Sequence, residues 1–447
     1  MTRRPAHVVA AVTGLLLLAV SGRYGYHRDE LYFLEAHQHL AWGYPDQPPL
    51  VPLLAHGHSL WLMRLPSTGS AALVVLLSGL MAERLGASRS AQWLATGATA
   101  MCGFVLATGH LLSTSTFDLL GWVLISYLVL RLLQGGDERL WLLVGLVGGV
   151  TFQANALVGF LLLALFLTLR RPGALMAGGL ALLIGLPYLV WQAQHGWPQL
   201  DVAHDIAQGG SKSSVSRPLL VPFFLLQVGP WVLPLWVLGL RRLLQDRLLK
   251  GLAHAFLLLA VVFVVLGGKP YYLSGLVPLL FAAGAQPLVE RVRRWPVLLV
   301  LSAPAIVFTL PVLPVSAAGV VLAVNPDSGE TIGWPSFAEQ VSAAVPPGDV
   351  VITGNYGEAG ALDRYTSLPV YSGHNGYALW GVPPGSAEAL VVGMPDALLA
   401  KLCTRVVEVG ELHSPHDLDN DENGTLLKTC VPKAPWRELW PQVRHIG

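Results

Sequence analysis

Charged side chains are scarce in this sequence of 447 residues, at 12% of the total. Soluble globular domains carry roughly twice that share, about 25%. Basic and acidic residues nearly cancel, giving a formal net charge of +1, and no basic stripe stands out. The small net charge argues against a nucleic-acid partner. With 53% hydrophobic residues, the chain does not fit an ordinary soluble domain.

Long apolar runs take the place of the missing charge. Runs of about 17 to 25 residues recur over the first 315 positions, which is the length that crosses a bilayer as a helix. Since hydrocarbon offers no partners to backbone amides, such runs should be helical. We predict eleven spans, at about 5–22, 66–83, 90–111, 116–133, 139–153, 156–169, 173–192, 219–240, 251–267, 271–288 and 297–315. A cleaved signal peptide over 2–22 is the alternative for the first run.

The distribution of lysine and arginine orients these spans, because cytoplasmic loops are enriched in them. With the N-terminus inside, the inner flanks hold fifteen basic residues: Arg3, Arg4, Arg84, Arg89, Arg131, Arg139, Arg170, Arg171, Arg241, Arg242, Arg247, Lys250, Arg291, Arg293 and Arg294. The outer loops hold six: Arg23, Arg28, Arg64, Lys212, Arg217 and Lys269. We therefore expect a multi-pass cell-membrane protein whose acidic first loop is extracytoplasmic.

This orientation limits the chemistry. The inner loops contain no Gly-rich phosphate loop, so a cytoplasmic enzyme that uses ATP or a nucleotide sugar is disfavoured. Any donor used outside must arrive without a cytosolic nucleotide, and a lipid carrier is the natural solution.

The C-terminal part differs in composition. Residues 316–447 hold fifteen of the 27 acidic residues, and the segments 349–353 and 389–392 predict buried strands with helices between them. We expect an α-helical polytopic membrane domain over 1–315, with a long first outer loop at 23–65, and a small extracytoplasmic α/β domain over 316–447. Cys403 and Cys430 lie in this second domain, where an oxidising exterior favours a disulfide; two free thiols are the alternative.

The first outer loop carries two adjacent carboxylates, Asp29 and Glu30. Acidic residues so near a bilayer are costly and usually functional. Asp29 is a candidate general base, taking a proton from an acceptor hydroxyl. The structural alternative is that Asp29 caps a helix beginning at Glu30. Consecutive helical side chains diverge by about 100°, so the two carboxylates should not meet at one atom.

Two further aspartates and one lysine complete the polar set. Asp46 lies in a Pro-rich turn, where it could bind substrate or only stabilise the turn. Asp118 begins the fourth span and either complements the helix dipole or lines the site. Lys269, between two outer span ends, could bind a phosphate together with Arg23 and Arg28, or only reach toward lipid headgroups.

Histidines and glycines give weaker signals. Eight histidines fall outside or at outer helix ends: His27, His37, His39, His56, His58, His110, His195 and His204. They raise the alternative of a divalent metal ion, but pairs two residues apart do not share a helix face, and we assign no metal ligands. The segment 353–360 resembles a strand-to-helix glycine turn without dinucleotide-binding spacing. The segment 371–375 either contacts an acceptor sugar or forms a loop.

Several segments together resemble a known family. They are "YGYHRDELYFLEAHQHLAWGYPDQPPL", "STSTFDLLGW", "PYLVWQAQHGWP", "GGKPYYLSGLVPLLFAAGA", "ETIGWP", "GNYGEAGALDRY" and "YSGHNGYALWG". The pattern is similar to bacterial members of the dolichyl-phosphate-mannose–protein mannosyltransferase-like family. These are integral membrane glycosyltransferases of the C-type fold, a group that includes the lipid A aminoarabinose transferases.

The resemblance implies inverting transfer of mannose or a similar sugar from a polyprenyl-phosphate donor to a protein, lipid or glycan acceptor at the outer face. Asp29 would be the catalytic base, with Glu30 and Asp118 as further catalytic candidates. Lys269 would bind the donor phosphate with Tyr271 and Tyr272, and with Arg23 and Arg28. Asp46, His195 and Asn155 are the substrate-binding candidates.

Asn155 departs from the family pattern, because it stands where a lysine is expected. The departure bears on the donor and on activity itself. Asn155 therefore keeps open the alternative of a non-catalytic binder of lipid-linked sugars. A separate alternative is a transporter or flippase for those lipids, which would need charged residues at mid-membrane and internal repeats.

Overall fold

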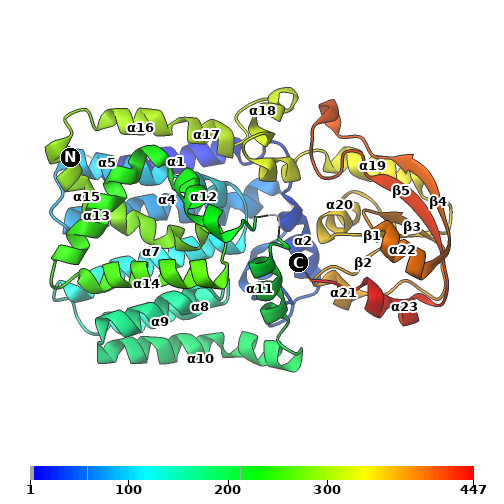
Figure 1. Cartoon of the computed structure of the whole chain (residues 1–447), viewed down its shortest axis with the longest axis horizontal. Helices are drawn as coiled ribbons and strands as arrows, with labels where there is room; N and C mark the ends of the chain where they lie inside the picture. The colour runs from blue at the N-terminus through cyan, green and yellow to red at the C-terminus, as the bar shows by residue number, and fades with distance from the viewer. Residues whose placement is uncertain (1–4, 58, 212, 447) are drawn as a thin grey trace. The chain divides into compact units, whose positions relative to one another are not determined.

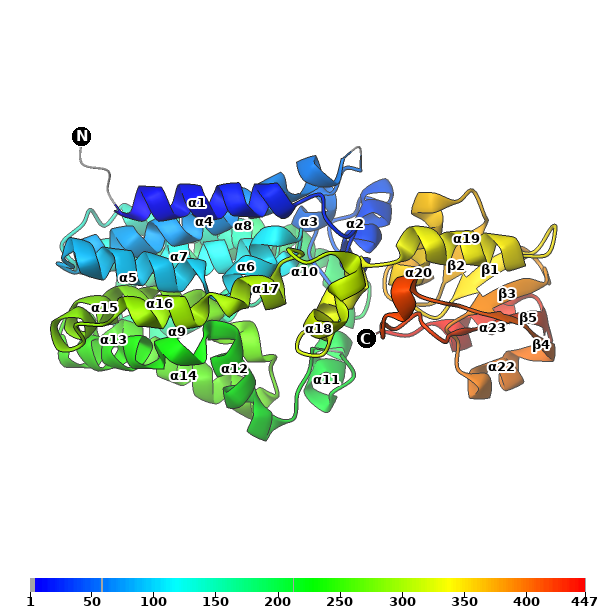
Figure 2. The same cartoon turned by 90° about the horizontal axis from the view of Figure 1, so that it is seen from above.

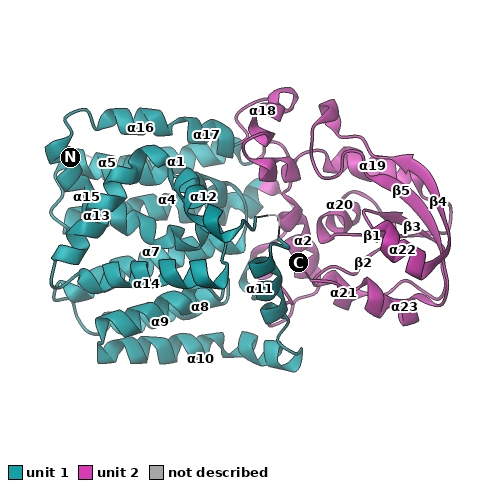
Figure 3. Ribbon diagram, viewed as in Figure 1, with its two compact units in different colours: residues 1–21, 47–51, 61–310 teal, residues 22–46, 52–60, 311–447 magenta. Residues whose placement is uncertain are grey.

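The structure is a computed structural model that describes residues 5–57, 59–211 and 213–446. Arg3, Arg4, His58 and Lys212, which entered the charge and histidine patterns, lie outside the described residues. The chain forms two compact units (Figure 3). Unit 1 comprises residues 1–21, 47–51 and 61–310, and unit 2 comprises 22–46, 52–60 and 311–447. Most of the first outer loop therefore folds together with the C-terminal part of the chain.

Unit 1 is a helical bundle. Its helices are α1 (Pro5–Val20), α4 (Leu60–Arg84), α5 (Arg89–Ala100), α6 (Gly103–His110), α7 (Thr114–Leu133), α8 (Leu140–Phe152), α9 (Val158–Leu169), α10 (Pro172–Gln194), α11 (Pro198–Gln208), α12 (Leu220–Val228), α13 (Leu233–Gln245), α14 (Lys250–Leu266), α15 (Val277–Arg291), α16 (Pro296–Ser302) and α17 (Pro304–Thr309). Helix α8 packs on α7 and α10, and α15 packs on α5 and α13. Figures 1 and 2 both show the long helices running along one another.

The surface of unit 1 suits a membrane. Among the described residues, four helical stretches are long and apolar enough to span one: α4, α7, α10 and 270–291. A bent pair, 217–228 with 230–245, would make a fifth, and five shorter apolar helices accompany them. Large apolar side chains point outward, including Leu183, Val265 and Val300, which are 65%, 65% and 70% exposed. Apolar surface of this kind is stable against lipid and costly in water. The count of eleven spans remains a prediction.

Three predicted spans are not continuous helices, and one of them, 297–315, divides into α16 and α17 and leaves the α-helix after Thr309. The predicted span 219–240 bends by 89° between α12 and α13. At the bend Gly229 has φ +109°, and Pro230 has no N–H to continue the hydrogen-bond ladder. The predicted span 90–111 divides into α5 and α6, because Cys102 takes an extended conformation between them. The apolar composition predicted these runs, but it did not predict where their helices are interrupted.

Unit 2 contains a five-stranded sheet with strand order β2-β1-β3-β5-β4. The strands are β1 (Val350–Thr353), β2 (Val370–Ser372), β3 (Ala389–Val392), β4 (Cys403–Glu411) and β5 (Leu426–Pro432). Strand β1 pairs in parallel with β2 and β3, whereas β5 runs antiparallel to β3 and β4. The two predicted strands are confirmed as β1 and β3, and both belong to a small C-terminal sheet.

Helices cover both faces of this sheet. In Figure 2, α19 (Trp334–Ala344) and α20 (Tyr356–Tyr365) lie on one side, and α22 (Asp396–Leu402) and α23 (Trp436–Val443) on the other. The second side forms a core in which Trp436 and Trp440 pack against β1, β3 and β5. The remaining elements of unit 2 are α2 (Arg28–Gln38), α3 (Leu50–Leu54, at the unit boundary), η4 (Val315–Ala317), α18 (Gly319–Leu322), η5 (Pro326–Thr331), α21 (Tyr377–Trp380) and η6 (Pro415–Asp417). Helix α2 packs on α20 (Figure 1).

The predicted disulfide is present. Cys403 at the start of β4 is bonded to Cys430 in the adjacent strand β5, with Cα atoms 5.6 Å apart. Both cysteines belong to the buried core of the sheet. The bond therefore ties the edge strand β4 to the centre of unit 2.

Replacing both cysteines by serine should destabilise unit 2 by about 3 kcal/mol, since the bond closes a loop of 27 residues in the unfolded chain. Thermal unfolding of the purified full chain checks this, with and without reductant. Reductant should lower the unfolding temperature of the native protein and leave the double variant unchanged. If reductant lowered the unfolding temperature of both proteins equally, the bond between Cys403 and Cys430 would be contradicted.

Candidate functional site

Asp29 lies in the first turn of α2, and it does not cap the helix. His27 is the N-cap: its Nδ1 accepts the amide N–H of Asp29 at 3.2 Å. The expectation that Asp29 caps a helix beginning at Glu30 is therefore wrong, because the helix begins at Arg28. The carboxylate of Asp29 is therefore not used in capping, and its side chain is 39% exposed.

Glu30 has the capping role instead. Its carboxylate accepts the backbone N–H of His27 at 2.8 Å, which completes a capping box, and the residue is fully buried. A carboxylate engaged in this way is poorly placed to meet a substrate. We therefore leave Glu30 out of the catalytic set proposed below.

Tyr356, at the first position of α20, holds Asp29. Its hydroxyl donates a hydrogen bond of 2.8 Å to Oδ1 of Asp29. The guanidinium of Arg28 lies over the tyrosine ring, 4.7 Å from its centroid. Burial and the negative charge of Asp29 raise the pKa of Tyr356 well above its usual value of 10. The phenol therefore remains protonated and remains a hydrogen-bond donor.

The two arginines of the first loop have partners within unit 2. Arg28 Nη1 lies 3.6 Å from a carboxylate oxygen of Glu330 and 4.0 Å from one of Asp421. Arg23 donates to the carbonyls of Val312 and Leu313, at 2.9 and 3.4 Å. Because both arginines have partners within unit 2, we leave Arg23 and Arg28 out of the proposed phosphate site.

Asp46 is tied to the same unit through Tyr32. The hydroxyl of Tyr32 donates to Asp46 at 2.7 Å and accepts the backbone N–H of Gly376 at 3.1 Å. Burial raises the pKa of Asp46 to about 7, although the hydrogen bond from Tyr32 opposes the shift. The pair connects the Pro-rich turn to α21, so the structural role of Asp46 is the one that the geometry supports.

In unit 1, Asp118 and Lys269 lie on neighbouring elements. Asp118 is in the second turn of α7, buried, and accepts the indole N–H of Trp122 at 2.9 Å. Lys269 immediately precedes η3 (Pro270–Leu276), which packs against α7. Tyr272 belongs to η3, three residues after Lys269, and so lies on the element that packs against the helix of Asp118. Asp118 is too far along the helix to act as a first-turn dipole partner, because Ser113 is the N-cap.

The remaining candidates of unit 1 make local contacts. Tyr271 stacks on Phe104 with ring centroids 5.1 Å apart, and Tyr272 packs edge-on against Phe263 at 5.3 Å. Asn155 Oδ1 accepts the backbone N–H of Leu157 at 3.0 Å. His195 stacks on Trp191, and its Nδ1 lies 2.8 Å from the Trp191 carbonyl. Asn155 and His195 thus stabilise their own turns.

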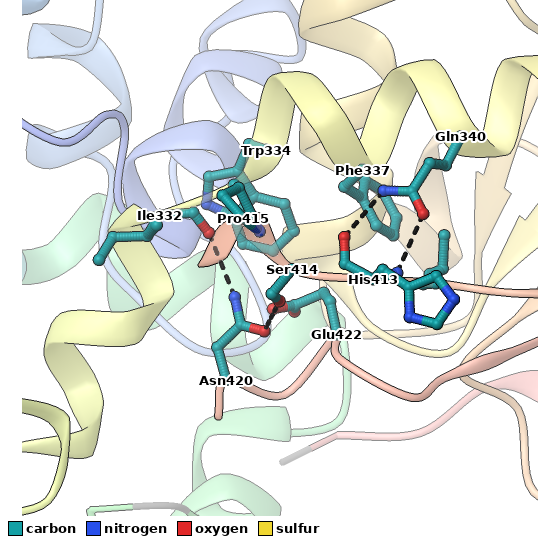
Figure 4. A pocket seen from close by; sticks show the side chains of 11 residues that line it. Ile332, Trp334, Phe337, Gln340, His413, Ser414, Pro415, Asn420 and Glu422 are labelled. Atoms are coloured by element: carbon teal, nitrogen blue, oxygen red, sulfur yellow. Dashed lines mark hydrogen bonds between the residues drawn. The ribbon is translucent and has the colours of Figure 1, made fainter. Parts of the chain in front are cut away.

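A pocket of unit 2 lies between α19 and the loop that follows β4 (Figure 4). Its polar groups bind one another: Asn420 donates to the carbonyl of Ile332 at 3.2 Å and accepts from the hydroxyl of Ser414. Gln340 exchanges two hydrogen bonds with the backbone of His413, both 2.9 Å long. These hydrogen bonds therefore hold the loop to α19.

No group of three or more histidine, cysteine or acidic side chains suited to a metal ion is found in the part of the chain that the structure describes. The strand-to-helix turn at 353–360 is present as the link between β1 and α20. A Cβ at Gly354 would lie 2.3 Å from the carbonyl oxygen of Gly393, so the backbone of this turn packs closely against the residue that follows β3.

Sequence reasoning singled out the segment around Tyr356 but did not find the contact with Asp29. The two residues are 327 positions apart, and nothing in the spacing of either motif signals the hydrogen bond. The candidate groups in unit 2 are Asp29 and Tyr356, which share a hydrogen bond. Those in unit 1 are Asp118, Lys269 and Tyr272, which lie on or beside the neighbouring elements α7 and η3.

Neither a family model nor a curated protein matches the chain. Solved structures do. The crystal structure of ArnT from Cupriavidus metallidurans in the apo state aligns with a TM-score of 0.62 at 15% identity, covering 94% of this chain and 97% of that one. The structure of the same protein bound to undecaprenyl phosphate gives 0.63 at 16% identity, with the same coverage. Over nearly its whole length, the chain has the fold of ArnT.

Proposed function

We propose that this protein is an integral membrane glycosyltransferase that transfers a sugar, mannose or a similar one, from a polyprenyl-phosphate donor to an acceptor at the outer face of the membrane. The observation that carries the proposal is the setting of Asp29. Its carboxylate is accessible and anchored through one oxygen in a chain that shares its fold with a protein solved in complex with undecaprenyl phosphate. The sugar and the acceptor are the finer parts of the proposal.

The reaction needs one base and one leaving group. The acceptor hydroxyl attacks the anomeric carbon, and its proton passes to Asp29. The bond from the anomeric carbon to the phosphate oxygen breaks, and polyprenyl phosphate departs with the electron pair. Attack from the face opposite the phosphate inverts the anomeric centre. A carboxylate that is held by a neighbouring donor loses little freedom on reaching this geometry.

Unit 1 supplies the proposed donor site. Departure of the lipid phosphate builds negative charge, which a nearby ammonium group stabilises most effectively where water is partly excluded. Lys269 is half-buried, and no ion pair holds its ammonium group among the described residues. We propose that Lys269 binds the phosphate, with Tyr271 and Tyr272 beside it and Asp118 lining the same site.

The disulfide supports the proposed orientation. Structural disulfides persist in oxidising compartments and are rare in the cytosol. A bond between Cys403 and Cys430 in the core of unit 2 fits an extracytoplasmic α/β domain. This agrees with the excess of arginine and lysine on the predicted inner flanks.

Deleting the gene and analysing cell-envelope glycans and lipid-linked sugars by mass spectrometry tests the proposal. We expect one envelope glycan to lose a sugar while the matching polyprenyl-phosphate sugar accumulates. Purified protein should then release polyprenyl phosphate from that donor when membranes of the deletion strain supply the acceptor. A flippase would change the sidedness of the donor without releasing polyprenyl phosphate, and that result would overturn the proposal.

A further inference from the structure

The α/β part of the chain contacts the proposed catalytic base directly. Asp29 and Tyr356 both belong to unit 2, and the phenol donates to Oδ1 of the carboxylate at 2.8 Å. Oδ2 accepts no hydrogen bond from Tyr356 and lies 3.9 Å from Nδ1 of His27. One carboxylate oxygen is thus anchored, and the other is the one left to receive a proton.

Tyr356 is itself rigidly held. It follows Asn355, which caps α20 in a capping box with Glu358. Its ring packs against Tyr32 at 4.9 Å and His374 at 4.7 Å, and the guanidinium of Arg28 covers it. Because a buried ring packed on several sides has one accessible rotamer, the hydroxyl has little choice of position.

Two glycines of α20 bring the helices close enough for this contact. A Cβ at Gly357 would lie 2.8 Å from Cβ of Arg28, and one at Gly360 would lie 2.9 Å from backbone and side-chain carbons of Leu31. Any larger residue would push α2 away from α20. The glycines therefore set the distance between the helix that carries Asp29 and the helix that carries Tyr356.

Helix α2 contacts the segments that follow the carboxyl ends of β1 and β2, which is where α/β sheets commonly bind ligands. Tyr356 follows the carboxyl end of β1, and Gly376, which donates to Tyr32, follows β2. Open parallel sheets usually bind small molecules outside these strand ends. In this chain the strand ends hold the acidic segment of its own first loop.

We propose that Tyr356 is a positioning residue for the transfer reaction, which orients the carboxylate of Asp29 so that Oδ2 faces the acceptor hydroxyl. The inference rests on the proposed function. During transfer the acceptor proton moves to Oδ2, the acceptor oxygen bonds to the anomeric carbon, and the phosphate leaves with its electron pair. The phenol of Tyr356 keeps its own proton throughout.

Tyr356→Phe tests this, because it removes the hydroxyl and keeps the ring. We expect kcat to fall about 10- to 100-fold with the KM for the donor unchanged, since misplacement of a reacting group by about 1 Å costs about 100-fold in rate. The assay follows release of undecaprenyl phosphate from synthetic undecaprenyl-phosphate mannose and from the donor that accumulates in the deletion strain, with deletion-strain membranes as acceptor.

Tyr377→Phe is the matched control. Tyr377 donates to Asp363 at 2.7 Å, in the same unit and with the same chemistry. It should lose a comparable amount of thermal stability and keep the native kcat. Equal kcat in Tyr356→Phe and the native protein would overturn the inference, as would an equal fall in the two tyrosine variants.

A cycle with Asp29→Asn separates this inference from the proposed function. Full activity in Asp29→Asn would refute Asp29 as base, whereas an inactive Asp29→Asn with a fully active Tyr356→Phe would refute only the role of Tyr356. Asp29→Ala removes the hydrogen bond between Asp29 and Tyr356, so the unfolding temperatures of Asp29→Ala, Tyr356→Phe and the double variant should be non-additive. Additive changes would contradict the contact even where no donor turns over.

Discussion

Asp29→Asn should abolish sugar transfer, with a rate at least about 1,000-fold below that of the native protein, because an amide cannot accept the acceptor proton. The substitution keeps an oxygen that can accept the hydrogen bond from Tyr356. The side chain also keeps its size at a site that is 39% exposed, so expression and folding should be preserved. Membranes that contain the variant and a polyprenyl-phosphate sugar provide the assay.

Asp363→Asn is the control for that experiment. Asp363 accepts a hydrogen bond of 2.7 Å from Tyr377, so the two carboxylates have the same kind of partner within unit 2. We expect Asp363→Asn to transfer sugar at the native rate. If Asp29→Asn were as active as Asp363→Asn, Asp29 would have no catalytic role.

Lys269→Ala should raise the KM for the donor about 10- to 100-fold, which is the effect of losing a charged hydrogen bond of about 1.5–3 kcal/mol. The side chain of Lys269 is half-buried and lies just before η3, an element that packs against α7, the helix that carries Asp118. A phosphate bound there would lose its cationic partner. Initial rates over a range of donor concentrations measure the effect, and added salt should weaken donor binding less in the variant than in the native protein.

Lys250→Ala provides the matched comparison. Lys250 starts α14, whereas Lys269 follows shortly after the end of the same helix, so the two lysines flank one helix at its two ends. Lys250 is exposed, and the predicted topology puts it on the inner side. The KM for the donor should be unchanged in Lys250→Ala. Equal effects of the two substitutions, or none for Lys269→Ala, would refute the phosphate assignment.

Composition and hydrophobic pattern were sufficient to predict the two main parts of the chain. Scarce charge and long apolar runs predicted a helical membrane part, and the acidic, strand-forming C-terminal part predicted a small α/β domain with a disulfide. These predictions succeed because hydrophobic periodicity and cysteine position act locally, through burial of each segment. The short motifs also predicted a C-type fold, the group that includes the lipid A aminoarabinose transferases, although sequence identity to the ArnT structures is only 15–16%.

Breaks within helices were harder to foresee. The 89° bend at Gly229 and Pro230 interrupts a run that is apolar throughout, and hydropathy does not register dihedral angles. The N-terminus of α2 shows the same limit: Asp29, Glu30 and His27 are all acceptable near a helix start, and only backbone geometry selects His27 as the cap.

The sequence by itself determined that the chain has a membrane-like helical part, an α/β part and an acidic first loop with Asp29 as its chemical candidate. Only the tertiary structure decided that this loop folds with the α/β part, that Glu30 is used in capping, and that Tyr356 holds Asp29. The reason is physical. A hydrogen bond between side chains 327 residues apart depends on the close approach of two helices, which Gly357 and Gly360 permit, and no local property of either segment encodes that distance.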